Sequence, residues 1–355
     1  MEIKIERAKT LKEKPDFNNL GFGKYFTDHM FVMDFSEEKG WHDARIVPFG
    51  YIPIHPASTV LHYGTEIFEG MKAYKTADGY QMFRPEENFK RMNDSAERLC
   101  LPELDVNETI DALVKLINID YDWIPDKPGT SLYIRPFMFG NDESLGVHAV
   151  HNATFVIILS PVGNYYAEGL APVKITIEDR DVRAVRGGTG YAKCGGNYAA
   201  SLRAGKLAAA RGFSQVLWLD GVDRKYIEEV GSMNVMFYIN GTVVTPKLTG
   251  SVLPGITRKS IIQILKDWGY KVEERLLSVD ELMSAAEDGS LSEAWGTGTA
   301  AVVSPIGRLY YEGKDLTVSN NQIGELTQKL YDELTGIQWG RVPDTRNWCY
   351  KVKLK

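Results

Sequence analysis

The chain has 355 residues, 44% of them hydrophobic and 25% charged, and a formal net charge of −6 at pH 7. This length exceeds what one hydrophobic core usually serves, so two domains with a ligand cleft between them are expected. The acidic balance and the lack of a Lys/Arg block argue against nucleic acid or an anionic membrane as the main partner. Without a long apolar run or a signal-like amino terminus, the sequence predicts a cytoplasmic protein that acts on small molecules.

Strands with a few helices are predicted for the first part of the chain. The predicted strands cover residues 31–35, 44–49, 131–139 and 153–162, with a hairpin over 71–83. One helix is predicted over 84–100, with Pro85 in its first turn. A second is predicted over 109–119, where Asp105 and Glu108 have the spacing of a helix cap.

Residues 164–172 contain Gly169 and Pro172 and show no periodicity, so they are predicted to link the domains. This boundary separates a small N-terminal α/β domain, residues 1–163, from a larger domain, residues 173–355.

The second domain is also predicted to mix strands and helices. Its predicted strands are 173–177, 215–220, 226–230, 234–239 and 242–245, and its predicted helices are 197–211, 256–268, 278–287 and 321–335. Asn240-Gly241 is a hairpin signal, and Ser278 with Glu281 forms a capping box. Short strands joined by hairpins favour mixed, largely antiparallel sheets with packed helices over a doubly wound nucleotide domain.

Cysteine and histidine usage indicates neither a disulfide scaffold nor a zinc site. Cys100, Cys194 and Cys349 form no Cys-x-x-Cys pair. His148 and His151 stand close together without a third ligand or a carboxylate partner, so we expect them to be structural or solvated. A reducing compartment fits this pattern.

Lys193 lies in the segment Gly-Tyr-Ala-Lys-Cys-Gly-Gly-Asn-Tyr-Ala, residues 190–199, where a loop gives way to a predicted helix. Glycines let a bulky planar group approach the backbone, and a lysine amine becomes a nucleophile once its pKa is depressed. Schiff-base chemistry is the hypothesis, and a surface lysine in a glycine turn is the alternative. Other residues must decide between the two.

A lysine-bound aldehyde cofactor such as pyridoxal phosphate needs a phosphate cradle and an acid at its pyridine nitrogen. Residues 253–257, Leu-Pro-Gly-Ile-Thr, open a predicted helix whose free N–H groups suit an anion. Residues 296–300, Gly-Thr-Gly-Thr-Ala, are predicted to form a second loop with N–H and hydroxyl donors. Glu228 and Glu229 alternate on a predicted strand, so one is expected to point into a cleft and the other to water; two solvated edge-strand acids remain the alternative.

Together these segments resemble the branched-chain amino acid aminotransferases, and most closely the longer subgroup that includes the mammalian enzymes. The similar segments, which follow in order along nearly the whole chain, are 22–30, 61–74, 91–102, 133–136, 190–198, 228–234, 253–258 and 296–300. The resemblance implies a fold-type IV pyridoxal phosphate enzyme of mixed α/β class, with two domains and the active site between them. It also implies a homodimer.

The resemblance implies a role for each residue of the cofactor site. Lys193 forms the Schiff base and shuttles the proton during catalysis. Glu229, not Glu228, pairs with the pyridine nitrogen, and Tyr198 bonds to the ring hydroxyl oxygen. The residues implied to hold the phosphate are Arg91, Ile256, Thr257 and Thr299.

For the substrate, the resemblance implies an apolar pocket that also admits glutamate. Its implied walls are Phe22, Tyr63 and Tyr133, and Arg135 supplies the charge for the second carboxylate. Four further positions are implied near the substrate. Ser232 and the Ala300 N–H contact it near its α-carboxylate, and Tyr165 covers the site from the interdomain loop. The implied residues that reach into the partner subunit's pocket are Leu145 and Val147.

The sequence also departs from the resemblance. The mammalian relatives carry a Cys-x-x-Cys pair after the last Gly-Thr loop, where this chain has Ala300-Ala-Val-Val-Ser304, so that redox switch is not expected.

The expected reaction is reversible transfer of the amino group of L-leucine, L-isoleucine or L-valine to 2-oxoglutarate, which gives glutamate. A D-amino-acid aminotransferase or an aminodeoxychorismate lyase on the same scaffold is the alternative. A pyridoxal carrier without turnover is the non-enzyme hypothesis. A P-loop at Gly205-Lys206 is set aside because Leu207 stands where Ser or Thr is needed.

Overall fold

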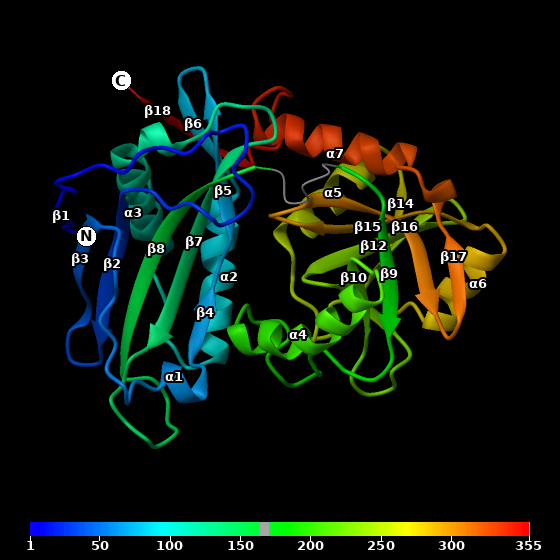
Figure 1. The fold of residues 1–355 in the computed structure, drawn as a ribbon, viewed down its shortest axis with the longest axis horizontal. Coiled ribbons are helices and arrows are strands. Elements are labelled where there is room, and N and C mark those ends of the chain that lie inside the picture. The colour runs from blue at the N-terminus through cyan, green and yellow to red at the C-terminus, as the bar shows by residue number, and fades with distance from the viewer. Residues whose placement is uncertain (164–169, 355) are drawn as a thin grey trace. The chain divides into compact units, whose positions relative to one another are not determined.

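The computed structural model describes residues 1–163 and 170–354 (Figure 1). Contacts divide the chain into two compact units. The first unit comprises Met1–Ala167, Ala192–Gly195 and Ile337–Lys355, and the second comprises Glu168–Tyr191 and Gly196–Gly336. Lys193 therefore belongs to the first unit. Its segment, Ala192–Gly195, is flanked in the sequence on both sides by residues of the second unit.

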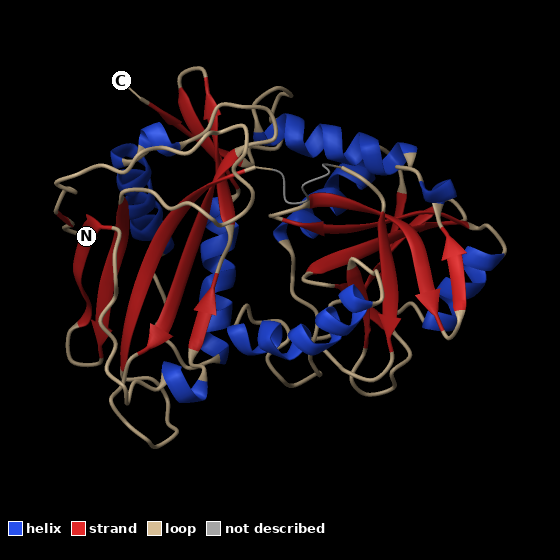
Figure 2. Ribbon diagram, in the orientation of Figure 1, coloured by secondary structure: helices blue, strands red, loops and turns tan. Residues whose placement is uncertain are grey.

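The first unit is built on one nine-stranded sheet (Figure 2). In spatial order its strands are β1 (Lys4–Ile5), β3 (Gly40–Pro48), β2 (His29–Ser36), β8 (Asn152–Val162), β7 (Ser131–Gly140), β5 (Met71–Thr76), β6 (Gly79–Phe83) and β18 (Cys349–Lys353), and β4 (Glu66–Phe68) pairs with β7. Every pairing is antiparallel except that of β1 with β3. The sheet is therefore composed mainly of hairpins and of antiparallel pairs between strands that are distant in the sequence.

Two long helices cover the core face of this sheet. They are α2 (Pro85–Arg98) and α3 (Val106–Ile119); α1 (Val60–Tyr63) and a 3₁₀ turn (Tyr121–Trp123) are shorter. Pro85 opens α2, and the Asp105 carboxylate accepts the Glu108 N–H at 2.8 Å to cap α3. Both signals are local, which is why the sequence predicted these helix starts.

Side chains alternate along β7 between the core and the opposite face. Leu132, Ile134 and Met138 are fully buried in the core with residues of α2 and α3. Tyr133 and Arg135 fall on the other face, because successive residues of a strand point to opposite sides. The sheet thus separates a packed core from a face that carries polar side chains.

The second unit also contains a nine-stranded sheet. In spatial order its strands are β11 (Ile227–Val230), β10 (Gln215–Leu219), β9 (Val173–Glu178), β16 (Val302–Tyr311), β15 (Leu291–Gly298), β12 (Met233–Ile239), β13 (Thr242–Pro246) and β14 (Lys271–Arg275), and β17 (Lys314–Thr317) pairs with β16. An additional pairing of β11 with β12 closes the strands from β11 to β12 into a ring. Because the ring is closed, β11 has a hydrogen-bonded neighbour on both sides.

Four helices accompany this sheet. They are α4 (Gly195–Ala210), α5 (Ile256–Asp267), α6 (Val279–Glu287) and α7 (Glu325–Gln338), with a 3₁₀ turn at Ser319–Asn321. The Ser278 hydroxyl accepts the Glu281 N–H at 3.1 Å and so caps α6 as predicted. Apolar residues of β12, β15 and α6 form the largest core cluster of the unit.

The predicted mixed, largely antiparallel architecture is confirmed, with two local corrections. Residues 296–298 were predicted as loop but lie within β15, where they pair with β12 and β16. The last helix was predicted from residue 321 but begins at Glu325. Ser319, Asn320 and Asn321 all have positive φ, and three left-handed residues in a row cannot belong to a right-handed helix.

Across the described residues, no helix combines the length and the apolar character that a membrane span requires.

Candidate active site

The backbone of Lys193 is fixed against β4 of the first unit. Its carbonyl accepts the Phe68 N–H at 2.9 Å, and its own N–H donates to the Ser95 hydroxyl at 2.9 Å. Cys194 forms a β-bridge with Ile67. The lysine is therefore held as the continuation of a strand edge, not as part of an open surface turn.

Gly195, at the start of α4, allows this close approach. Its N–H donates to the Glu66 carboxylate, and a Cβ at this position would overlap Glu66 Oε1. Burial raises the pKa of the Glu66 carboxyl above its ordinary value, although the Gly195 N–H and the charge of Arg135 act in the opposite direction. A side chain at position 195 would therefore push the Glu66 carboxylate away from the Gly195 N–H.

Two cations lie near the ring of Phe68. Lys193 Nζ is 4.7 Å from the centroid of the Phe68 ring, and Arg135 Cζ is 4.8 Å from it. Arg135 also donates to the Tyr133 hydroxyl at 3.2 Å, and the rings of Phe22 and Tyr133 meet edge to face with centroids 4.9 Å apart. The structure therefore brings four predicted residues together around an aromatic ring that the sequence reasoning did not single out.

Gly70 explains how Tyr133 reaches this position. A Cβ on Gly70 would overlap the Tyr133 hydroxyl oxygen, so only glycine leaves room for the phenol. The Nε of Arg135 is buried without a hydrogen-bond partner, so this aromatic cluster keeps an unused cationic donor. Such a donor suits a carboxylate.

Arg91 is paired with Glu69, a second residue that sequence reasoning missed. Glu69 is fully buried and accepts from Arg91 Nε at 2.8 Å and Nη2 at 2.9 Å. Asn88 Nδ2 donates to the same carboxylate at 2.8 Å. A two-point contact of this kind fixes the plane of the guanidinium.

The charge state of Glu69 follows from these contacts. Burial alone would raise its pKa, but the charge and hydrogen bonds of Arg91 hold that pKa below its ordinary value. The charge of Lys193 acts in the same direction. Glu69 is therefore ionised at neutral pH. Its negative charge attracts both Arg91, which is predicted to bind the phosphate, and Lys193, the predicted catalytic lysine.

In the second unit, Glu229 is surrounded by donors. Arg183 Nε lies 2.8 Å from its Oε2, in an ion pair whose N–H is not aligned for a hydrogen bond. Asn234 Nδ2 and the Leu253 N–H donate to its Oε1 at 3.0 and 3.1 Å. These partners favour the ionised carboxylate.

The expectation that either Glu228 or Glu229 points to water is wrong. The two residues are 4% and 3% exposed, because β11 is paired on both sides within the closed ring. The alternative, two solvated acids on an edge strand, is wrong for the same reason.

The helix start predicted at residues 253–257 is confirmed: α5 begins at Ile256. Gly255 is the N-cap and no side chain caps the helix, and Ile256 and Thr257 form its buried first turn. A Cβ on Gly255 would overlap Asn234 Oδ1, so the glycine brings this helix start close to the strand that carries Asn234. An uncapped helix start offers its N–H groups to an anion.

The second predicted loop is reduced to the turn of residues 299–301. The Thr297 hydroxyl, in the preceding strand, is buried without a partner. Val302 follows the turn at φ 62, an outlier for a β-branched residue that costs on the order of 1–3 kcal/mol. An orphan hydroxyl, an uncapped helix and an ionised carboxylate fit a ligand that carries a phosphate and a protonated ring nitrogen.

The other predicted residues differ in exposure. Tyr198 is half-buried in the first turn of α4, Ala300 is half-buried, and Ser232 is exposed in the β11–β12 turn. Tyr165 lies outside the described residues.

Tyr63 is associated with the predicted partner-facing loop. Leu145 and Val147 are 79% and 78% exposed, and the Tyr63 hydroxyl donates to the Leu145 carbonyl. The structure thus links Tyr63 to the exposed loop that carries Leu145 and Val147.

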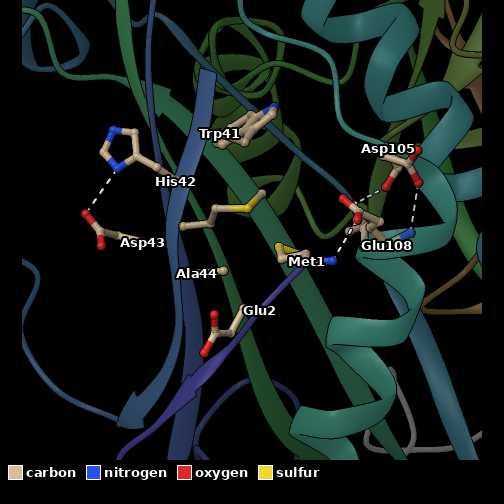
Figure 3. Close-up of a pocket in the computed structure, with 10 residues that line it drawn as sticks. Met1, Glu2, Trp41, His42, Asp43, Ala44, Asp105 and Glu108 are labelled. Atoms are coloured by element: carbon tan, nitrogen blue, oxygen red, sulfur yellow. Dashed lines mark hydrogen bonds and ion pairs between the residues drawn. The ribbon is translucent and has the colours of Figure 1, made fainter. Parts of the chain in front are cut away.

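A cavity of about 270 Å³ in the first unit contains none of the predicted site residues (Figure 3). Its lining is Met1, Glu2, Met33, Trp41, His42, Asp43, Ala44, Asp105, Glu108 and Thr109. The Met1 amine donates to Glu108 Oε1 at 2.7 Å within it. One of its acidic groups, Glu108, therefore binds the Met1 amine, and we assign the cavity no part in the chemistry.

Comparison with known proteins agrees with this geometry. The family model for class IV amino-transferases matches residues 66–309. Branched-chain-amino-acid aminotransferase 2 of Bacillus subtilis is 54% identical over 351 residues, which cover 99% of this chain and 97% of that protein.

Solved structures agree as well. The Escherichia coli branched-chain amino acid aminotransferase has a TM-score of 0.76 at 28% identity, over 90% of this chain and 98% of that one. The branched-chain amino acid aminotransferase from Thermoproteus uzoniensis, solved with norvaline, has a TM-score of 0.75 at 25% identity, over 91% and 99%. The chain belongs to the class IV aminotransferases and, within them, to the branched-chain amino acid aminotransferases.

Proposed function

We propose that this protein reversibly transfers the amino group of L-leucine, L-isoleucine or L-valine to 2-oxoglutarate, with pyridoxal phosphate as cofactor. The observation that carries the proposal is the Lys193 cluster: a lysine with a fixed backbone and an amine over Phe68, in a chain 54% identical to a branched-chain aminotransferase along its length.

The residues that we propose to hold the cofactor supply complementary groups. The phosphate accepts from Arg91, from the first-turn N–H groups of Ile256 and Thr257, and from Thr299. Tyr198 donates to the ring hydroxyl oxygen, and Glu229 holds the ring nitrogen protonated. When bound, pyridoxal phosphate supplies the aldehyde that takes up the amino group and a ring that withdraws electrons from the substrate's α-carbon.

In the proposed reaction, Lys193 transfers the proton that leaves the substrate's α-carbon. With its backbone held by Phe68 and Ser95, the side chain pivots about a fixed Cα, so its Nζ can take a proton from one carbon and return it to another. The Phe68 ring lies 4.7 Å from the amine and offers it an aromatic contact. The Glu69–Arg91 pair keeps a fixed negative charge near the lysine.

Substrate choice follows from the Phe68 cluster. Phe22, Phe68 and Tyr133 offer apolar walls to a branched side chain, and Arg135 with its unused Nε offers a donor to the second carboxylate of glutamate. One pocket can thereby accept both substrate types. Ser232 and the Ala300 N–H are assigned to the α-carboxylate, and Tyr165 to covering the site.

We further propose a homodimer in which Leu145 and Val147 reach into the partner's pocket, on a loop that the Tyr63 hydroxyl contacts. Their joint exposure in one chain supports this, since contiguous exposed apolar side chains favour an interface. A cytoplasmic location is proposed because the three cysteines are free.

A panel of L- and D-amino-acid donors with 2-oxoglutarate tests the reaction. Glutamate formation with L-leucine, L-isoleucine and L-valine and with no D-isomer is expected. Turnover of D-amino acids, or pyruvate release from aminodeoxychorismate, would assign the chain to one of the two alternative activities. A cofactor spectrum that L-leucine does not change would indicate a carrier.

A further inference from the structure

Two adjacent buried glutamates in the second unit feel the charge of one guanidinium, which contacts only the second of them. Arg183 is 7% exposed, and Glu228 and Glu229 are 4% and 3% exposed. Arg183 Nε contacts Glu229 Oε2 at 2.8 Å, and the charge of Arg183 also acts on Glu228. The guanidinium therefore contacts Glu229 directly, whereas it acts on the buried Glu228 only through its charge.

The two carboxyl groups differ in the number of protein groups that contact them. Glu229 has Arg183, Asn234 and the Leu253 N–H as partners. Within the described part of the chain, Glu228 receives the Ser251 hydroxyl on Oε1, and its buried Oε2 has no hydrogen-bond partner there. A buried charge with one donor is far more costly than a buried neutral acid.

The charged groups around Glu228 agree with this contrast. Burial is the largest influence and raises the pKa of Glu228 above its ordinary value; Ser251 and Arg183 lower that pKa, and Glu229 and Asp220 raise it, without reversing the upward shift. When two acids lie close together, the one with fewer stabilising partners keeps its proton.

Ser251 connects Glu228 to Arg183. Its hydroxyl donates to Glu228 Oε1 and lies 2.9 Å from the Thr249 hydroxyl. Its carbonyl accepts from Arg183 Nη2. The side chain of Glu228 therefore helps to fix the carbonyl that orients Arg183.

The loop before Lys193 joins the same network. Arg183 Nη2 also donates to the Gly190 carbonyl at 3.1 Å, and a Cβ on Gly190 would overlap the Ser251 carbonyl. The guanidinium is thus held by two carbonyls while its Nε faces Glu229.

We propose that Glu228 is a positioning residue that stays a neutral carboxylic acid bonded to Ser251, so that Arg183 neutralises Glu229 alone and leaves a single ionised carboxylate on this strand. The proposal rests on the proposed function in one respect: Glu229 is taken as the partner of the cofactor's ring nitrogen. A second negative charge, on Glu228, would attract Arg183 away from Glu229. The strand would then carry two ionised carboxylates in place of one.

Infrared difference spectroscopy tests the protonation state independently of catalysis. Spectra of wild-type protein minus Glu228→Gln, with and without pyridoxal phosphate at pH 7, are expected to show the C=O band of a protonated carboxylic acid. Wild type minus Glu103→Gln, at an exposed glutamate, is the control and is expected to show only carboxylate bands. Carboxylate bands in the Glu228 difference would overturn the proposal.

Rescue by the isosteric amide tests positioning. The dissociation constant of pyridoxal phosphate is expected to rise at least tenfold in Glu228→Ala and in Ser251→Ala, and to return to within about threefold of wild type in Glu228→Gln, because Gln keeps an oxygen for Ser251. Thermal unfolding checks that the variants fold. Equal losses in the Ala and Gln variants would refute a neutral positioning role.

Glu229→Gln separates failure of the inference from failure of the proposed function. A large change in the pH titration of the cofactor's absorbance is expected there. If Glu229→Gln leaves that titration unchanged, the assigned role of Glu229 fails, whereas the infrared result on Glu228 still decides the inference by itself.

Discussion

Replacing Glu69 by Gln is expected to destabilise the protein strongly, because Glu69 neutralises the buried guanidinium of Arg91. Glu69 is 0% exposed and accepts from Arg91 at 2.8 and 2.9 Å, from Asn88 at 2.8 Å and from the Gly70 N–H at 3.1 Å. A glutamine offers one oxygen in place of two and turns an amide donor toward other donors. Breaking one partner of a buried ion pair costs about 3–5 kcal/mol.

Urea unfolding of the apoprotein measures this loss. Glu87→Gln, on the same helix as Arg91, is the control, because its contacts with Arg84 and Lys90 at 3.6 and 3.7 Å are those of a partly exposed pair worth about 0–1 kcal/mol. Combining Glu69→Gln with Arg91→Gln is expected to cost much less than the sum of the single losses. Additive losses, or a Glu69 effect as small as that of the control, would refute the buried-pair reasoning.

The pH dependence has a definite sign. The pKa of Glu69 is lowered in the folded state, so its stabilisation is present above the ordinary carboxyl pKa and is lost as the pH falls through the folded value. The difference in unfolding free energy between wild type and Glu69→Gln is therefore expected to stay constant from neutral to mildly acidic pH and to shrink below it.

Three further outcomes are expected. Arg135→Ala should raise the KM for glutamate about 10- to 150-fold, as expected for a charge-assisted contact of roughly 1.5–3 kcal/mol, and change that for leucine little; parallel losses would place Arg135 at the α-carboxylate. Mixing inactive Lys193→Ala with inactive Leu145→Asp/Val147→Asp subunits should restore activity in heterodimers confirmed by native mass spectrometry, and no rescue would refute a shared pocket. Burial lowers the pKa of Lys72 from 10.5 to about 8, so the unfolding free energy of the wild type is expected to rise relative to that of Lys72→Met as the pH rises from 8 toward 10.5; a difference independent of pH would exclude this cause.

Elements with local signals were predictable from the sequence. Pro85, Asp105 with Glu108, and Ser278 with Glu281 fix helix starts through contacts within four residues. The hairpin at Asn240-Gly241 has the positive φ values that these residues adopt readily.

Elements that depend on distant pairing were not predicted. Gly296–Gly298 has the composition of a turn, but pairing with β12 and β16 makes it a strand. Strand β18 pairs with β6 from the other end of the chain, and strands β14 and β16 take parallel partners, so no local pattern marked them.

The candidate site was predictable through family resemblance more than through chemistry. Phe68 and Glu69 lay within the similar segment 61–74, but an aromatic residue and an acid carry no local sign of a cation partner. Arg183 was missed because its partner Glu229 is distant in sequence. A buried carboxylate needs a cation, and this rule could have prompted a search for Arg183. The rule applies only once Glu229 is known to be buried, which the sequence does not show.

The most direct test of the central claim is borohydride reduction of the pyridoxal phosphate-loaded protein followed by peptide mapping, with Lys193→Ala as the control. The label is expected on Lys193 in the wild type, and the Lys193→Ala variant should bind the cofactor without fixing it and turn over no L-leucine. A label on Lys72, Lys206 or Lys247, together with L-leucine turnover by the variant, would contradict the account.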